Sequence, residues 1–166
     1  MKTKNIILTA LFIAMAIVIN IAENAFPLPL PGVKLGLANI FALTALILLG
    51  VKEAYAVIIL RVVLVWLLTG NIFAFSCSMV GGLLAVTVMS IQYTKYKRLF
   101  SISGISISGA WAFNVGQILV ATLFVKDITI MYYIIPLLLI GTATGWAVGS
   151  TAKYLCKRIE TSLIKR

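Results

Sequence analysis

The chain has 166 residues, of which 62% are hydrophobic and only 11% are charged. A soluble domain of this length cannot bury so much apolar surface, so the composition predicts an all-α integral membrane protein with one compact domain, residues 1–166. The net charge of +10 does not indicate nucleic acid as a partner, because the basic residues cluster at the ends of apolar runs. The sequence has no histidine, which excludes a histidine-based metal site or catalytic triad, and we expect no metal and no bound cofactor.

Six apolar segments follow one another along the chain, and charged or turn-forming residues separate most of them. Even the shortest would cover ~24 Å as a helix, which nearly spans the hydrocarbon core of a bilayer. We therefore predict a bundle of six transmembrane helices, over residues 6–24, 35–50, 54–69, 72–93, 105–125 and 128–155.

The basic residues predict the orientation of this bundle. Of the 14 lysines and arginines, all except Lys34, Arg61 and Lys126 fall on the side of the two termini. Positive charge gathers on the cytoplasmic side of membrane proteins, so both termini are predicted to be cytoplasmic.

The connection between the first two segments is rich in proline. Pro27, Pro29 and Pro31 forbid a continuous helix, because proline lacks an N–H group and fixes φ. Irregular backbone is tolerated at a membrane only at its surface or over a protein cavity. We interpret this segment as the outer cap of a binding pocket.

Arg61 lies near the middle of the third predicted helix, roughly 13–15 Å from either end. Burying a guanidinium at that depth costs at least ~2.5–3.5 kcal/mol, so Arg61 needs a partner or a wet cavity. It is either a structural arginine, bonded to carbonyl groups or to Glu23, or an anchor for an anionic ligand. Lys34 lies where the chain re-enters the membrane after the proline-rich segment. It is either a second anion-binding group or an ordinary interfacial lysine.

Further candidates for the pocket lie on three of the predicted helices. Trp111, Asn114 and Gln117 recur every three residues, and amides in lipid need partners, so we expect this stripe to face inward. Asn39 lies one turn inside the second helix, and Trp66 precedes an outer turn, where aromatic residues otherwise form an interfacial belt. The predicted substrate-binding residues are Lys34, Asn39, Arg61, Trp66, Trp111, Asn114 and Gln117.

Small residues form two stripes. Gly141, Gly145 and Gly149 recur every four residues and predict close helix packing, while Ala10 and Ala14 form a shorter stripe of the same kind.

The segment from Phe26 to Ile40, Phe-Pro-Leu-Pro-Leu-Pro-Gly-Val-Lys-Leu-Gly-Leu-Ala-Asn-Ile, follows a helix with Ala10-x-x-x-Ala14. In these features, and in length and helix layout, the chain resembles the substrate-binding S components of energy-coupling factor (ECF) transporters. More narrowly, it resembles the Gx transporter branch, also called heptaprenyl diphosphate synthase component I. The resemblance implies capture of a vitamin-like ligand from outside and docking on a transmembrane coupling subunit that carries two cytoplasmic ATPases. It also implies that Ala10 and Ala14 face the coupling subunit, and that the protein lies in the plasma membrane of a prokaryote.

An enzymatic role has little support in the sequence. There are only four acidic residues, with no paired aspartate motif for magnesium diphosphate and no phosphate-binding glycine loop. We therefore expect a transport subunit, not an enzyme, for an anionic amphipathic ligand of the flavin or prenyl diphosphate type. The alternatives are a membrane accessory subunit of a prenyl diphosphate synthase and a scaffold without transport.

Overall fold

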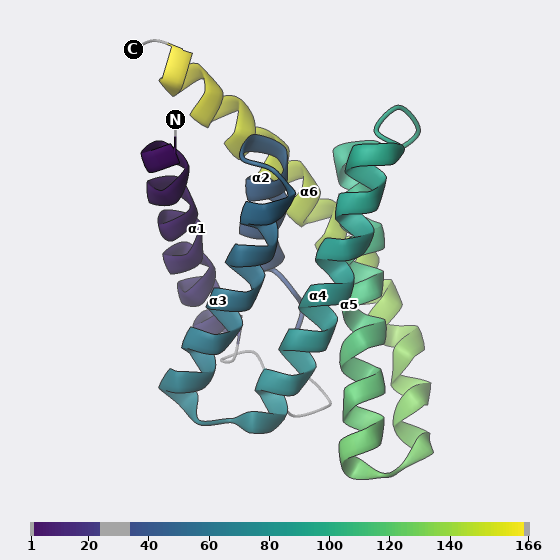
Figure 1. The fold of residues 1–166 in the computed structure, drawn as a ribbon. Coiled ribbons are helices and arrows are strands. Elements are labelled where there is room, and N and C mark those ends of the chain that lie inside the picture. The colour runs from purple at the N-terminus through teal and green to yellow at the C-terminus, as the bar shows by residue number, and fades with distance from the viewer. Residues whose placement is uncertain (1, 24–33, 165–166) are drawn as a thin grey trace.

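The computed structural model describes residues 2–23 and 34–164, and it is all-helical across these ranges (Figure 1). The predicted fold class is therefore confirmed. The elements are α1 Lys2–Glu23, α2 Asn39–Leu48, α3 Val51–Thr69, α4 Ile72–Lys95, α5 Ile102–Val125, the short 3-10 helix η1 Ile128–Tyr133, and α6 Ile134–Ile164.

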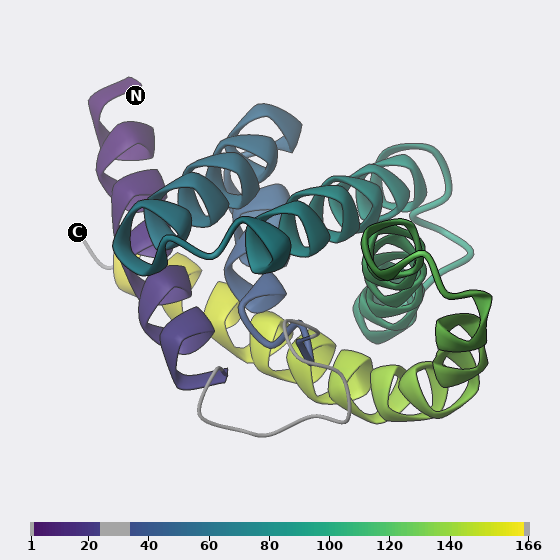
Figure 2. The same cartoon turned by 90° about the horizontal axis from the view of Figure 1, so that it is seen from below.

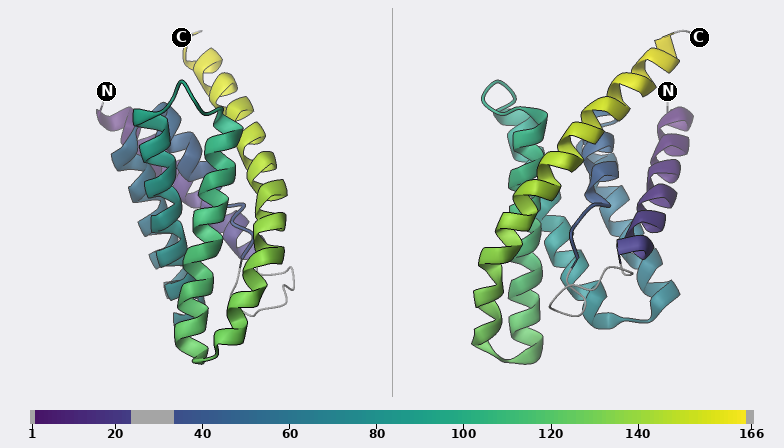
Figure 3. Two further views of the ribbon diagram at one scale, coloured as in Figure 1. Left: turned by 90° about the vertical axis from the view of Figure 1, so that its right-hand side faces the viewer. Right: turned by 180° about the vertical axis from the view of Figure 1, so that it is seen from behind.

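Both ends of the chain lie at one end of the bundle, together with the α2–α3 and α4–α5 connections (Figure 1). The α3–α4 turn and the α5–η1 turn lie at the opposite end. Helix α5 packs against α4 on one side and α6 on the other. Helix α6 runs obliquely across the bundle from α5, past α2, toward the side of α1 (Figures 2 and 3). Which end faces the cytoplasm stays a prediction.

Within residues 2–23 and 34–164, four stretches of helix are long and apolar enough to cross a membrane: α1, α4, α5, and η1 with α6. The protein is therefore a multi-pass membrane protein. Helix α3 has 19 residues but carries Lys52, Glu53 and Arg61. Helix α2 has only 10 residues, so it covers about 15 Å and crosses only part of a bilayer core.

The prediction that the second helix begins at Leu35 was wrong, because α2 begins at Asn39. Gly36 has φ +79°, a left-handed conformation that does not continue a helix. Instead, two side chains from other helices bond to the backbone of residues 34 and 37. Residues 34–38 thus form a non-helical segment inside the bundle, and α2 begins near the middle of the bundle.

Other predicted boundaries also move. Helix α1 spans Lys2–Glu23 instead of 6–24, α2 ends at Leu48 instead of 50, α3 begins at Val51 instead of 54, and α4 ends at Lys95 instead of 93. Helix α5 begins at Ile102, not at 105, because the Ser101 hydroxyl caps it by accepting a hydrogen bond from the Gly104 amide at 3.1 Å. The last segment begins as η1, and α6 then continues to Ile164, beyond the predicted end at residue 155. Hydropathy marks where an apolar run ends, and a helix can continue in polar sequence.

The glycine stripe of α6 lies at the contact with α5. A Cβ at Gly145 would come within 2.8 Å of the Ile107 Cα, and one at Gly149 within 2.6 Å of the Ser103 Cα. At Gly141 it would meet the Asn114 side-chain nitrogen at 2.5 Å. The two helices approach so closely that there is no room for a larger residue at these three positions.

Candidate functional site

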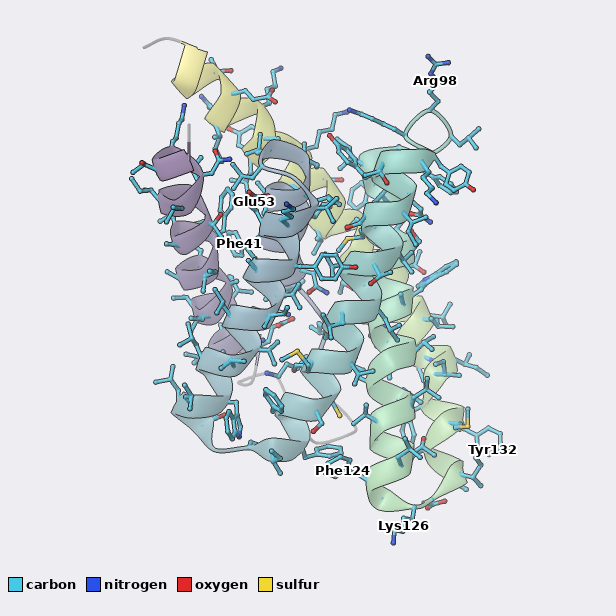
Figure 4. The ribbon with its side chains drawn as sticks, in the orientation of Figure 1. Phe41, Glu53, Arg98, Phe124, Lys126 and Tyr132 are labelled. Atoms are coloured by element: carbon cyan, nitrogen blue, oxygen red, sulfur yellow. The ribbon has the colours of Figure 1, made fainter. Side chains whose placement is uncertain are left out.

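A cavity of about 330 Å³ opens between α3 and α4, in the half of the bundle away from the termini. Figure 4 marks this end of the molecule by Phe124 and Lys126. The volume lies near the lower limit for small-molecule sites. The cavity is lined by Asn20, Lys34, Val62, Val65, Trp66, Thr69, Asn71, Ala74, Phe75 and Ser78.

Lys34 brings a cation to this cavity. Its side chain is only 5% exposed, and its Nζ donates a hydrogen bond to Asn20 Oδ1 at 2.5 Å. A neutral amide oxygen orients the ammonium group but does not neutralise it. The buried charge of Lys34 is therefore available to a ligand with a negative group.

Arg61 is buried still deeper, with 1% of its surface exposed. Its Nη2 donates to Asn39 Oδ1 at 3.4 Å, a long hydrogen bond, and its Nε has no partner among the described residues. Arg61 does not line the cavity, although Val62 and Val65 on the same helix do. Arg61 is therefore buried next to lining residues of α3 without being part of the cavity wall.

Glu23 lies at the end of α1, next to the beginning of α2. Its Oε1 accepts a hydrogen bond from the Leu37 amide at 2.5 Å, while its Oε2 has no partner among the described residues. The N-terminal end of a helix carries partial positive charge, so this position partly compensates the Glu23 carboxylate.

The charges of the buried centre do not balance. Among the described residues, the buried charged side chains are Glu23, Lys34 and Arg61, which gives two positive charges, one negative charge and a net charge of +1 (2 − 1). An unbalanced charge in a membrane protein interior is costly, which makes this centre the candidate site of the molecule. This centre can accept one further negative charge.

The two amides predicted on helix five meet this centre. Gln117 Oε1 accepts from the Lys34 amide at 3.0 Å, and Gln117 Nε2 donates to the Lys34 carbonyl at 2.9 Å. Gln117 Nε2 also donates to Asn114 Oδ1 at 2.9 Å, and Asn114 Nδ2 donates to the Leu137 carbonyl of α6 at 2.7 Å. These contacts hold the backbone of Lys34 to α5 and α6.

The two tryptophans predicted for the pocket differ in position. Trp66 lines the cavity, and its ring lies 5.2 Å from that of Phe75, centroid to centroid. Trp111 is 45% exposed, and its Nε1 donates to Thr142 on α6, so the expectation that it faces inward was wrong. A three-residue step turns a helix by only about 300°, so the stripe drifts around α5 and leaves the interior at Trp111.

Sequence reasoning missed much of the cavity wall. On α3 the wall is formed by residues 62, 65, 66 and 69, and on α4 and its cap by residues 71, 74, 75 and 78. Both sets follow the i, i+3, i+4, i+7 spacing of one helix face. Because Trp66 was predicted to line the pocket, the same spacing would have identified its neighbours on α3.

The alanine stripe lies elsewhere on the molecule. Ala10 and Ala14 are both exposed on α1. Ala10, but not Ala14, lines a second, apolar groove of about 510 Å³ between α1 and α3, near the termini, with Ala56, Leu60 and Lys52 among its other residues. The predicted cap with Pro27, Pro29 and Pro31 lies outside the described residues.

Comparison with known proteins gives one match. A family model described as heptaprenyl diphosphate synthase component I matches residues 12–155. Neither the curated proteins nor the solved structures include a significant match to the chain.

Proposed function

Because the chain belongs to the heptaprenyl diphosphate synthase component I family, we propose that it works as the S component of an ECF-type transporter. In this role it captures an anionic, amphipathic small molecule from the outer side of a prokaryotic plasma membrane. The observation that carries the proposal is the buried centre with a net charge of +1 beside a cavity of about 330 Å³. A negatively charged ligand removes the charge imbalance.

The wall of the cavity is consistent with a ligand of two parts. Lys34 and Asn20 offer charge and hydrogen bonds, while Trp66 and Phe75 offer aromatic surface. The volume suits a compact flavin-type molecule or the head of a prenyl diphosphate, whose chain would extend into the lipid. In the proposal, Arg61 adds attraction for the anion without lining the cavity.

The groove between α1 and α3 supports docking on a partner helix. Small residues such as Ala10 and Ala56 let a second helix approach closely, and the groove is mostly apolar. We assign it to the transmembrane coupling subunit, which brings two cytoplasmic ATPases. The partner must supply the energy, because this sequence has no phosphate-binding glycine loop.

We propose no catalytic role for this chain. Diphosphate chemistry with magnesium needs carboxylates that lie together. The four acids belong to different parts of the chain, since Glu23 ends α1, Glu53 begins α3, Asp127 precedes η1 and Glu160 lies in α6, and no group of three or more potential metal ligands occurs among the described residues.

The second candidate function is a membrane accessory subunit of a prenyl diphosphate synthase, which the description of the family favours. Affinity purification of the tagged chain from its own host, in mild detergent, separates the two. Recovery of a membrane coupling subunit with two ATPases supports the transporter, provided Ala10→Leu abolishes it. Recovery of a soluble synthase, with no ATPase, would reject the transporter.

A further inference from the structure

We propose that Gln117 is a positioning residue that sets the Lys34 cation in the cavity and does not itself bind the ligand. This inference rests on the proposed function, because it concerns how the same site attracts an anion. It also changes the sequence-based assignment of Asn114 and Gln117, which placed both among the ligand-binding residues.

The hydrogen bonds of Gln117 are already used within the protein. The side chain is 0% exposed. Its amide nitrogen has two protons, and it donates to the Lys34 carbonyl and to Asn114 Oδ1. Its oxygen accepts from the Lys34 amide. An anion needs hydrogen-bond donors, and both donors of Gln117 are taken, so binding one would require Gln117 to give up its bond to Lys34 or to Asn114.

The segment that carries Lys34 needs this support. Residues 34–38 are not helical, and in a membrane protein the backbone groups of such a segment must bond within the protein. Gln117 satisfies both backbone groups of Lys34, and Glu23 satisfies the amide of Leu37. The backbone of Lys34 is thereby fixed, and the Asn20 amide oxygen fixes the ammonium group at the end of its side chain.

The same contacts connect the cavity to α6. Asn114 bonds both to Gln117 and to the Leu137 carbonyl, and it packs against Gly141. Asn114 therefore links the position of α6 to the side chain that holds Lys34. Position 117 thus controls the location of the cation, and Asn114 transmits to it the position of α6.

The test uses Trp66 as a reporter in the cavity. In a W111F/W146F background, Trp66 is the remaining tryptophan, since the chain has three. Quenching of its fluorescence is measured in a neutral detergent at constant ionic strength, with iodide as an anionic probe and acrylamide as a neutral probe. The variants in this background are Lys34→Met, Gln117→Met, Asn114→Ala and, as a matched control on α5, Ser106→Ala.

Each variant has a defined expectation. Lys34→Met lowers the ratio of iodide to acrylamide quenching constants by about twofold, because one neighbouring unit charge changes the local anion concentration by roughly that factor. Gln117→Met lowers the ratio by a similar factor, although Lys34 is still present. Asn114→Ala lowers it less, and Ser106→Ala leaves it unchanged. A merely structural loosening raises both quenching constants together and leaves their ratio unchanged.

The outcomes test the positioning role of Gln117 separately from the anion site itself. A ratio that falls in Lys34→Met but not in Gln117→Met overturns the positioning role alone. A ratio that Lys34→Met leaves unchanged overturns the anion site itself, and with it the proposed function. Folding of Gln117→Met is judged by whether the thiols of Cys77 and Cys156 stay buried. If this variant does not fold, Asn114→Ala tests the positioning role instead. An unchanged quenching ratio in Asn114→Ala then overturns that role.

Discussion

Replacing Arg61 with methionine tests whether this residue attracts an anionic ligand or stabilises the fold. The guanidinium is buried, its one hydrogen bond is 3.4 Å long, and its Nε has no partner among the described residues. Methionine fills a similar volume without a charge. With Arg61 gone, the buried charges of Glu23 and Lys34 balance at zero (1 − 1).

The expected change in stability is small. Removing the unpaired donor gains about 1–3 kcal/mol, and leaving Asn39 Oδ1 without a partner costs a similar amount. The two nearly cancel, and loss of the uncompensated positive charge favours the mutant, so we expect the free energy of unfolding of the ligand-free protein to stay the same or rise by less than about 1 kcal/mol. At this chain length that is a shift in Tm of less than about 4 °C. A well-paired buried arginine would instead cost about 3–5 kcal/mol.

Thermal unfolding can be followed with a thiol-reactive fluorophore, because both cysteines are free and buried. Arg98→Met, which removes an exposed arginine from the α4–α5 connection, is the control and should leave Tm unchanged. A fall in Tm of about 8 °C or more for Arg61→Met, with the control unchanged, would show that Arg61 is a structural anchor and refute the reasoning.

Three further predictions concern helix packing, docking and capping. Gly141→Ala should destabilise the protein by about 1–3 kcal/mol, because the added methyl group meets Asn114 at 2.5 Å. Gly104→Ala, whose nearest contact is 3.4 Å, should be neutral or stabilise the protein by up to about 1 kcal/mol. Thermal unfolding of both variants measures these effects, and equal effects would contradict the prediction. Ala10→Leu should block co-purification of the coupling subunit while leaving iodide quenching of Trp66 unchanged, and normal co-purification would reject the docking groove. Asn71→Ala should cost about 1 kcal/mol, because the Asn71 side chain caps α4 by accepting from the Ala74 amide at 2.9 Å, and an unchanged Tm would count against the cap.

The helices were predictable from sequence because apolar runs and their charged ends are local signals. Burial of Arg61 was predictable for the same reason, since a charge in the middle of an apolar run must find the protein interior. The length of α2 was not predictable from the sequence, because it depends on side chains that are distant along the chain. Gln117 lies 83 residues from Lys34, and its bonds to that backbone replace the helical ones.

The sequence also could not predict which of the two cations lines the cavity. Lys34 lines the cavity and Arg61 does not, and this depends on how α3 is rotated against α4. Trp111 shows the same limit. Its spacing from Asn114 placed it within one turn of a buried amide, but the packing of α6 on α5 leaves it at the surface.

The most direct measurement is native mass spectrometry of the protein extracted gently from its host membrane. The account predicts one bound molecule that carries a negative charge, and it predicts that Lys34→Met reduces its retention strongly while Ser106→Ala does not. A bound neutral molecule, or equal retention of an anionic one by Lys34→Met and the unaltered protein, would contradict the claim that this buried positive centre exists to bind an anion.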